Sequence, residues 1–422
     1  MNRLAQFLHY AQKVFALKTL LRAVGDGRPF AKIRTTPVLF SLVLGVVLRI
    51  SSYLDLAQQT KRRRWRHLCG LLAAISHDTF EYVTERLNLE HLRQALASVA
   101  KTLKANKALE SCKINGLLFV SLDANEHCKS RSRCCECCCQ RQVEETDPEG
   151  HKHKVTEYYH RYVFAQINGP KINALLDLEP IRPGEEECGA ALRLLGRMRR
   201  VYGPRFFDAI TVDAWYVQGP FLRAVEKLGW LWVVVFKQER MEAYQEAIQL
   251  SQGQKPLQTF EDQERGRHVQ LWEVKDLHFS KEYGQPVRVV RSQEQWVEQR
   301  VRGGRKGREP RQSQWLWMAS AKLNGYAGQV IYRAGHRRWG IENKAFNELT
   351  QAYHLEHCYH HEPVSMLAQM LILMLGFTLF TAFAQLNSKL VRLGELSAKA
   401  LTKEMDLALE EDLPWEQWFH SG

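Results

Sequence analysis

The first 108 residues are patterned for helices. Between residues 76 and 109, apolar side chains recur every three to four positions, the spacing that places them on one face of an α-helix. Ser76 is suited to cap the N-terminus of such a helix, and Asp78 falls in its first turn. No strand-like run precedes Asn115. The pattern therefore predicts a separate all-α domain over residues 1–108.

From Asn115 onward, the pattern changes to short apolar runs that are typical of buried strands. Three such runs precede the first helical segment; the first run ends at Asp123, and the fourth ends at Asp213. The order strand-strand-strand-helix-strand-helix-strand is that of the ribonuclease H-like fold, so we expect an α/β core with a mixed five-stranded sheet and flanking helices. The expected strands cover residues 114–125, 156–167, 172–181, 206–215 and 230–237, with helices over 184–203 and 219–229.

Residues 238–322 interrupt this alternation. They are polar, rich in glutamine and basic, and their apolar runs indicate strands rather than helices. We interpret them as an inserted, mainly-β subdomain, after which helical patterns return. The insertion divides the core into a first part over residues 109–237 and a helical C-terminal part over 323–422. The expected strands of the insertion cover residues 267–277, 286–292 and 313–321.

Two apolar stretches raise the question of membrane insertion. In residues 35–51 the apolar core is too short to span a bilayer before Arg49 interrupts it. Residues 363–386 approach spanning length but contain polar residues such as Gln369. Because the surrounding sequence is strongly charged, we interpret this stretch as a buried core helix. A membrane anchor is the alternative, and it predicts that the protein sediments with membranes during fractionation.

The composition favours an anionic partner. The formal net charge is +13, and basic residues cluster at 61–67, 193–205 and 300–311, with tryptophans interleaved. Each run alone is equally typical of a solvated surface, but together they favour nucleic-acid binding, with residues 1–108 as a DNA-binding domain. Core packing is the alternative role for the tryptophans. The candidate DNA contacts are Arg63, Arg64, Trp296, Arg302, Arg305 and Lys306.

Two aspartates come from strands that should be neighbours. In a ribonuclease H-like sheet the first strand is central and the fourth lies beside it, so Asp123 and Asp213 are expected to meet at one sheet edge. Carboxylates at such an edge suit Mg²⁺, a hard ion that prefers oxygen ligands. A third acid normally arrives from a helix packed on the sheet, and Glu342 is positioned to supply it. Glu348 and Glu356 are alternatives for that third position.

These residues carry a resemblance to a known family. The segments "SLDAN", "ITVDAWY" and "RRWGIENKAFNEL" resemble, in order and context, the motifs of DDE transposases of bacterial insertion sequences, in the branch with a β-strand insertion. Arg338 and Glu342 match the spacing of the third motif. Gly335 stands where the family has Tyr, and Leu349 or Thr350 stands where it has Lys. Tyr332 and Lys344 are the nearest substitutes.

The resemblance implies an activity and its machinery. Asp123, Asp213 and Glu342 are expected to bind Mg²⁺, with Mn²⁺ as a substitute, and Arg338 to contact a phosphate. The expected reaction is cleavage at the ends of an insertion sequence, followed by joining of the 3′-hydroxyls to target DNA by two-metal phosphoryl transfer. The expected partners are double-stranded DNA, both terminal inverted repeats and target, and a second copy of the chain on paired ends, with no membrane.

Three other classes of function stay open. A domesticated or cleavage-only nuclease of the same fold would cut DNA without strand joining. A zinc-containing DNA-binding regulator would have no catalysis at all. The membrane protein considered above is the third. The N-terminus shows no signal-peptide cleavage site, and ten cysteines without such a signal fit a reducing cytosol. We therefore expect a cytoplasmic, nucleoid-associated bacterial protein.

The role of the clustered cysteines is a separate question. Residues 131–141 read "RSRCCECCCQR", which places five of the ten cysteines in one polar stretch after Asp123. Reduced, unligated thiols are the simplest interpretation. A structural zinc is the second, with Cys128, Cys135, Cys138 and His151 as one candidate set, in which Cys134 and His153 are alternatives. A redox role is the third. A second group of histidines with Cys358, over residues 353–363, suits DNA contact or packing, with zinc as the alternative.

Overall fold

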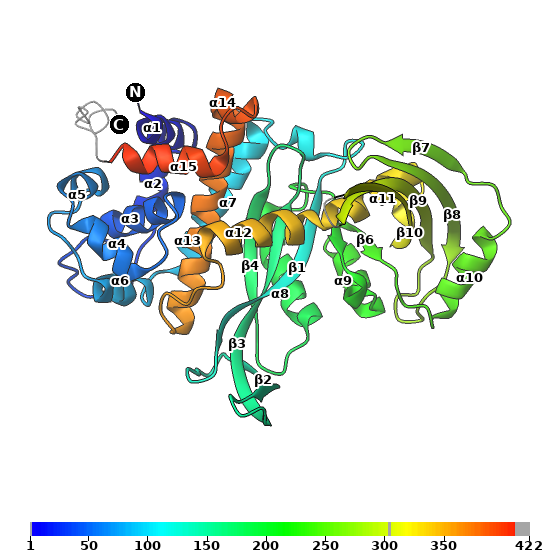
Figure 1. Cartoon of the computed structure of the whole chain (residues 1–422), viewed down its shortest axis with the longest axis horizontal. Coiled ribbons are helices and arrows are strands. Elements are labelled where there is room, and N and C mark those ends of the chain that lie inside the picture. Colours follow the sequence, from blue (N-terminus) through cyan, green and yellow to red (C-terminus); the bar gives the residue numbers. More distant parts are fainter. Residues whose placement is uncertain (1, 303–304, 410–422) are drawn as a thin grey trace. The chain divides into compact units, whose positions relative to one another are not determined.

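The structure is a computed structural model that describes residues 2–302 and 305–409, without the side chains of residues 300–302, 305–306, 343 and 344. The chain divides into two compact units (Figure 1). Unit 1 consists of Met1–Cys112, Ala124–Ala190 and Glu342–Gly422, and unit 2 consists of Lys113–Asp123 and Ala191–Ile341. The predicted helical domain falls inside unit 1, and the predicted insertion falls inside unit 2.

Unit 1 is mostly helical. The helical pattern that starts at Ser76 is divided into two helices, and the side chain of Asn88 caps the second by accepting a hydrogen bond from the backbone N–H of His91 at 3.1 Å. The helices are α1 (Arg3–Phe15), α2 (Leu17–Arg22), α3 (Thr35–Val47), α4 (Tyr53–Thr60), α5 (Arg63–Cys69), α6 (His77–Thr84), α7 (Leu89–Ala105), α12 (Asn347–Tyr353), α13 (Pro363–Ala382), α14 (Lys389–Arg392) and α15 (Ala398–Leu407).

Helix α13 is the apolar core of unit 1. It packs against α3, α6, α7 and β4 (Ala174–Ile181). Its polar side chains are satisfied there: Gln369 accepts a hydrogen bond from the Tyr53 hydroxyl at 3.1 Å, and the Ser365 and Thr84 hydroxyls lie 2.6 Å apart. By length and composition the helical stretch Pro363–Asn387 qualifies as a membrane span, but 89% of its most apolar window is buried inside the structure. This burial agrees with the interpretation as a core helix.

The strands of unit 1 surround the long strand β3 (Lys152–Ile167). Its first half pairs antiparallel with β2 (Cys139–Thr146), and its second half pairs antiparallel with β4. No strand was expected at β2, which begins in the polar, cysteine-rich stretch 131–141. Its side chains alternate between exposed and half-buried along the whole strand, so no apolar face reveals it in the sequence.

Unit 2 is built on a sheet with the order β1-β5-β6-β10-β9-β8-β7. The pairs β1–β5 and β5–β6 are parallel, and the remaining pairs are antiparallel. The helices of this unit are α8 (Glu187–Tyr202), which begins in unit 1, α9 (Gly219–Lys227), α10 (Glu242–Ser251) and α11 (Gly328–Arg338). The strands are β1 (Phe119–Ser130), β5 (Ala209–Val212), β6 (Leu231–Val235), β7 (Gln258–Asp262), β8 (Arg267–Leu277), β9 (Val287–Arg302) and β10 (Arg305–Ser320).

The strand pairing matches the predicted fold class. Strand β1 neighbours β3 on one side and β5 on the other, which gives the order β4-β3-β1-β5-β6 of a ribonuclease H-like core. Two details differ from the expectation. Strand β1 continues past Asp123 to Ser130, so Asp123 lies within the strand rather than at its end. The insertion also contains helix α10 and the short strand β7, which has only one buried residue, Asp262.

Candidate active site

The parallel pairing of β1 with β5 places two aspartates at matching positions. Ser121 is the Cα partner of Thr211, and the two hydroxyl oxygens lie 2.9 Å apart. Asp123 and Asp213 each follow two positions later. Because side chains alternate between faces along a strand, both carboxylates point to the face that carries Ser121 and Thr211. The register thus places the two predicted acids at corresponding positions of neighbouring strands, two residues beyond the pair Ser121–Thr211.

Asp123 is paired with a buried arginine. The Arg338 guanidinium donates a hydrogen bond from Nη1 to Oδ2 of Asp123 at 2.8 Å, and only 5% of the arginine side chain is exposed. The carboxylate is 15% exposed. A largely desolvated ion pair of this kind is costly to break by removing one partner. The pair therefore fixes the C-terminal end of α11 against β1.

Asp213 is held at the end of β5. Its Oδ1 accepts a hydrogen bond from the backbone N–H of Trp215 at 2.9 Å, so the carboxylate caps the short 3₁₀ turn Ala214–Tyr216. The Trp215 side chain is 61% exposed. The half-buried carboxylate of Asp213 thus has a fixed orientation next to an exposed aromatic ring.

A buried charge cluster holds α11 on the inserted strands. Glu294 on β9 is fully buried and contacts two arginines and one histidine: Arg267 at 2.6 Å, Arg265 at 2.9 Å and His336 of α11 at 2.6 Å. Burial alone would raise the pKa of the Glu294 carboxyl, but these partners outweigh it and lower the pKa to about 2. Burial also lowers the pKa of His336, although Glu294 opposes that shift.

This cluster predicts a loss of stability in acid. A carboxyl whose pKa falls from 4.5 to about 2 on folding contributes stability that is complete above about pH 4.5 and is lost as the pH falls through about 2. We expect the urea midpoint, followed by tryptophan fluorescence, to fall across that window. Glu294→Gln should lower the midpoint at pH 7 and flatten the fall. Glu261→Gln, which removes an exposed partner of His268, should change neither; an unchanged acid profile in Glu294→Gln would contradict the assignment.

Gly335, at the position of the family tyrosine, has no space for a side chain. A Cβ at this position would overlap the indole of Trp317, which is 1% exposed. Tyr332 does not act as a substitute within the site. It is fully buried, its hydroxyl donates to Asp262 at 2.8 Å and accepts from Arg265 at 2.9 Å, and burial raises its pKa. Tyr332 is therefore a packing residue of α11.

Glu342 lies in an irregular helix. It is the second residue of the π-helix Ile341–Phe346, four positions after Arg338, and its side chain is exposed. Glu342 is also the first residue of the last segment of unit 1, and its role as a third metal ligand stays a prediction. π-Helices are frequent at functional sites. Leu349, at the position of the family lysine, is fully buried, and the side chain of Lys344 lies outside the described residues.

The predicted DNA contacts near the N-terminus have different environments. Arg63 is exposed at the start of α5. Arg64 donates a hydrogen bond from Nη1 to the backbone carbonyl of Leu409 at 3.2 Å. The neighbouring Trp65 is fully buried, and its Nε1–H donates to the Ser41 hydroxyl at 2.6 Å. Of these residues, Arg63 is the one whose side chain is presented to solvent.

The predicted DNA contacts of the insertion lie on the β9–β10 hairpin. Trp296 is half-buried beneath the guanidinium of Arg267, which sits 3.9 Å from the ring centroid. This stacking favours packing as its role. Arg302, Arg305 and Lys306 lie at the hairpin end, where β9 and β10 pair, but their side chains lie outside the described residues.

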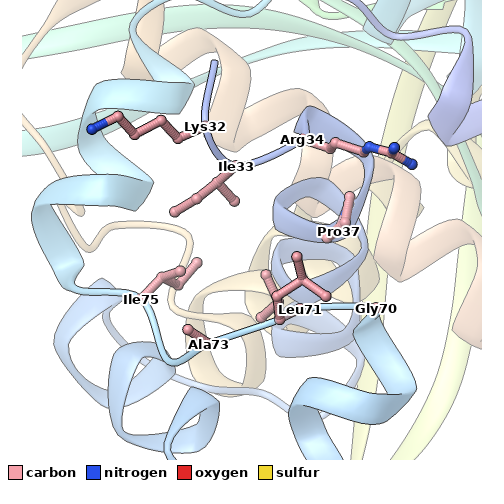
Figure 2. Close-up of a pocket in the computed structure, with 9 residues that line it drawn as sticks. Lys32, Ile33, Arg34, Pro37, Gly70, Leu71, Ala73 and Ile75 are labelled. Carbon is pink, nitrogen blue, oxygen red and sulfur yellow. The ribbon is translucent and has the colours of Figure 1, made fainter. Parts of the chain in front are cut away.

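A hollow in the N-terminal helices was not anticipated. It encloses about 470 Å³ between the segment before α3 and the connection from α5 to α6. Figure 2 shows Lys32 and Arg34 on its rim and Leu71 and Ile75 along its wall. Since its lining contains no carboxylate, the hollow does not offer the ligands that a Mg²⁺ site needs.

The predicted zinc set is brought together only in part. Cys135 and Cys138 lie side by side, and the two groups next to them are His160 and His361 rather than His151. His151 instead lies in an exposed turn with Asp147 and Glu149.

Cys128 also lies outside this cluster, beside Cys358 and His361. The sequence drew attention to the histidine-rich run that contains His361 but not to His160. That residue lies in the middle of a strand, 22 positions after Cys138, where no local motif marks it.

Two comparisons with known proteins gave a match. Residues 181–379 match the family described as Transposase DDE domain. The match begins at the end of β4 and includes Asp213, Arg338 and Glu342 but not Asp123. The chain is also similar to a cryo-EM structure of a piggyBac transposase synaptic complex with hairpin DNA, with a TM-score of 0.41 and 13% identity over 99% of this chain and 83% of that chain. No curated protein matches the sequence.

Proposed function

Residues 181–379 of this chain are a transposase DDE domain, and on this premise we propose that the protein is a DNA transposase that cuts and joins DNA strands by metal-dependent phosphoryl transfer. The observation that carries the proposal is the matched placement of Asp123 and Asp213 on neighbouring parallel strands, with Arg338 at the first of them. We further propose that the chain is encoded by a mobile DNA element, a bacterial insertion sequence that moves by cut and paste.

The donor atoms of the site suit a hard divalent cation. Both aspartates offer carboxylate oxygens, and neither carboxylate is fully buried, so ions and phosphates can reach them from solvent. Asp123, Asp213 and Glu342 would hold Mg²⁺, with Mn²⁺ as a substitute. Metal bound there would activate a hydroxyl nucleophile and stabilise the leaving oxygen of in-line attack on phosphate.

The protein groups around the metal ligands have their own roles. Arg338 offers a buried positive charge beside Asp123, where it would orient the carboxylate and contact a phosphate oxygen. The cap at Asp213 holds the second carboxylate in one orientation before metal or DNA arrives. The cluster around Glu294 keeps α11, and with it Arg338, at a fixed place on the sheet. Together these contacts preorganise the site.

The partners and setting follow from the same proposal. The net charge of +13 favours double-stranded DNA as substrate, both as terminal inverted repeats and as target. We propose that the chain acts as a homodimer on paired ends and works in the bacterial cytoplasm on the nucleoid. A cleavage-only nuclease of the same fold is the second candidate, because an intact pair of aspartates serves cutting as well as joining.

A strand-joining assay tests the proposal and separates the two candidates. The substrate is a duplex from DNA that flanks the gene, carrying an inverted repeat whose transferred strand is labelled at its 5′ end, together with a supercoiled plasmid target. With Mg²⁺ or Mn²⁺, the purified chain is expected to transfer the label to the plasmid, and Ca²⁺ or chelator should prevent it. Cleavage of the repeat without joining would establish the nuclease. If the protein neither cleaves nor joins any of the flanking repeats, the transposase proposal is refuted.

A further inference from the structure

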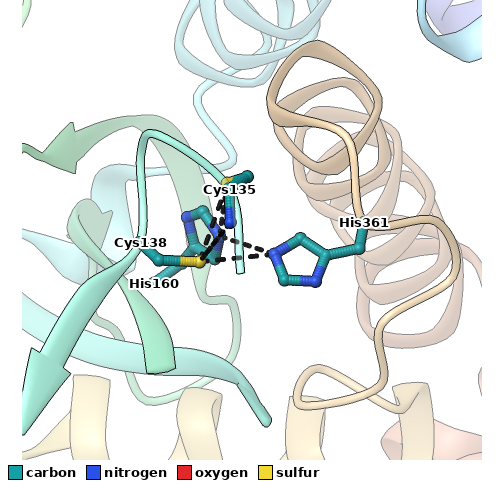
Figure 3. A group of neighbouring side chains, drawn as sticks. All are labelled: Cys135, Cys138, His160 and His361. Atoms are coloured by element: carbon teal, nitrogen blue, oxygen red, sulfur yellow. Dashed lines mark hydrogen bonds between the residues drawn. The ribbon is translucent and has the colours of Figure 1, made fainter. Parts of the chain in front are cut away.

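Four side chains from three separate segments of unit 1 converge on one point. Cys135 and Cys138 lie in the turn before β2, His160 lies on β3, and His361 lies in the loop between α12 and α13. Figure 3 shows the two sulfur atoms and the two imidazole rings turned toward a common centre. Their ligand atoms all lie within 4.8 Å of one another. Two sulfurs and two imidazole nitrogens are a donor set that zinc prefers.

The distances between these atoms have the size of a tetrahedral zinc site. With Zn–S of about 2.3 Å and Zn–N of about 2.05 Å, the edges of a tetrahedron are about 3.8 Å for S–S, about 3.5 Å for S–N and about 3.3 Å for N–N. The Cys135–Cys138 sulfurs are 3.6 Å apart. Three of the four sulfur–nitrogen distances are 3.5, 3.3 and 3.4 Å, and the two histidine Nε2 atoms are 3.4 Å apart.

Hydrogen bonding alone explains this arrangement less well. The Nε2 atom of His160 faces the Nε2 atom of His361 as well as both sulfurs, so four groups point at the same small volume. A thiol has one proton to donate, and a neutral imidazole has one N–H. These few protons cannot satisfy every convergent contact at once, whereas a single cation at the centre engages all four lone pairs. The arrangement is that of ligands around an ion.

The residues around the four side chains bury and orient them, as the surroundings of a structural metal site do. Cys138 is 8% exposed and His160 is 5% exposed, and the ring of Tyr162 stacks on His160 with an interplanar angle of 17°. The backbone N–H of Cys135 donates to the sulfur of Cys138 at 3.3 Å, a contact that stabilises a thiolate. The sequence Cys-x-x-Cys gives the two sulfurs the spacing of one half of a zinc site.

We propose that Cys135, Cys138, His160 and His361 bind a structural Zn²⁺ ion. All four positions of the tetrahedron are filled by protein, so no position is left for water or substrate, and the ion has no catalytic role. Two thiolates balance its charge. The zinc ties the cysteine-rich turn to β3 and to the segment before α13, and it closes a loop of 223 residues between Cys138 and His361. This metal is distinct in ligand chemistry from the Mg²⁺ proposed for the carboxylates.

The cysteine stretch supplies its own matched controls. Cys134 and Cys137 are exposed neighbours of Cys135 and Cys138 in sequence, and neither belongs to the cluster. Cys128 and Cys358 form the neighbouring group with His361. Serine at each of these positions removes one thiol with the same change in size. The three kinds of variant therefore separate this site from a general loss of thiols and from a metal held by the neighbouring group.

The test is the metal content of the full-length protein, purified without chelators and measured by elemental analysis. We expect one zinc per chain in the wild type and in Cys134→Ser and Cys137→Ser, and at least about a fivefold loss in Cys135→Ser, Cys138→Ser, His160→Ala and His361→Ala. Cobalt introduced in place of zinc should give the visible spectrum of a tetrahedral ion with two thiolates. This wild-type spectrum reports an ion held by two thiolates even if a ligand variant does not fold, and the same spectrum in Cys128→Ser and Cys358→Ser excludes the neighbouring group.

Three results would overturn the proposal. The first is a wild-type protein, grown with zinc, that contains none. The second is a cobalt spectrum without thiolate-to-metal absorption. The third is zinc that is lost in Cys128→Ser and Cys358→Ser but retained in Cys135→Ser, which would move the ion to the neighbouring group. None of these readouts depends on DNA cleavage, so they stand apart from the test of the transposase proposal.

Discussion

Replacing Asp213 or Asp123 with asparagine is expected to abolish DNA cleavage while DNA binding persists. Each change keeps the shape of the side chain but removes a negative oxygen ligand, so the metal is bound weakly or in the wrong place. Metal stabilisation of the transition state is worth several kcal/mol, and a loss of about 4 kcal/mol lowers the rate about a thousandfold. Cleavage of a labelled terminal-repeat duplex and its retardation in a gel measure the two properties separately.

Acids outside the site provide the comparison for these variants. Asp78→Asn changes an exposed aspartate that is paired with His77, and it should leave cleavage within about twofold of wild type. Glu342→Gln should behave like the two aspartate variants. Glu348→Gln and Glu356→Gln should not, and loss of activity in one of them but not in Glu342→Gln would transfer the third position to that residue. Full cleavage by Asp213→Asn would remove Asp213 from the site.

Replacing Gly335 with alanine is expected to destabilise unit 2 although it adds a single methyl group. The new Cβ would overlap the Trp317 indole, and that ring cannot withdraw, because it is buried and in edge contact with Tyr332 and His336 at centroid distances of 5.7 and 4.8 Å. Overpacking of this kind costs about 1–3 kcal/mol. Urea unfolding followed by tryptophan fluorescence should show the lower midpoint directly, since Trp317 is at the contact.

Gly196 is the matched control for Gly335. It also lies within a helix, α8, but a Cβ there meets no atom within 4 Å. Gly196→Ala should therefore leave stability unchanged or raise it by up to about 1 kcal/mol, since alanine is the better helix former. Equal effects of the two substitutions would show that the indole contact does not limit position 335. A large loss only at Gly335 would explain why this chain lacks the family tyrosine there.

The parts of the fold that could be predicted are those with an apolar pattern. The core strands β1, β3, β4, β5 and β6 are buried over much of their length, so each appears in the sequence as an apolar run, and their order identified the fold class. Strand β2 has no apolar face and was missed for that reason. The extension of β1 past Asp123 was missed because its next residues, from Ala124 to Glu126, are half-buried and mixed in character.

The candidate site also contains residues that the sequence could predict and contacts that it could not. Asp123 and Asp213 were predicted to meet because each closes an apolar run, and strand order alone makes those runs neighbours. The cap on Asp213 is a local backbone contact that composition does not reveal. The cluster around Glu294 joins this residue to side chains up to 42 positions away, and no spacing rule connects them. His160 and His361 are 201 positions apart, so only the folded chain shows them next to each other.

The division of unit 1 into three chain segments has a consequence for synthesis on the ribosome. Its N-terminal helices are made first, yet α13, the apolar helix that α3, α6 and α7 pack against, begins only at Pro363. All of unit 2 is translated in between. Nascent chains therefore carry the uncovered apolar faces of the early helices through most of elongation, which is a state that chaperones bind and that aggregates when they are scarce. Expression yield should accordingly depend on translation speed and chaperone supply more than on the stability of the finished protein.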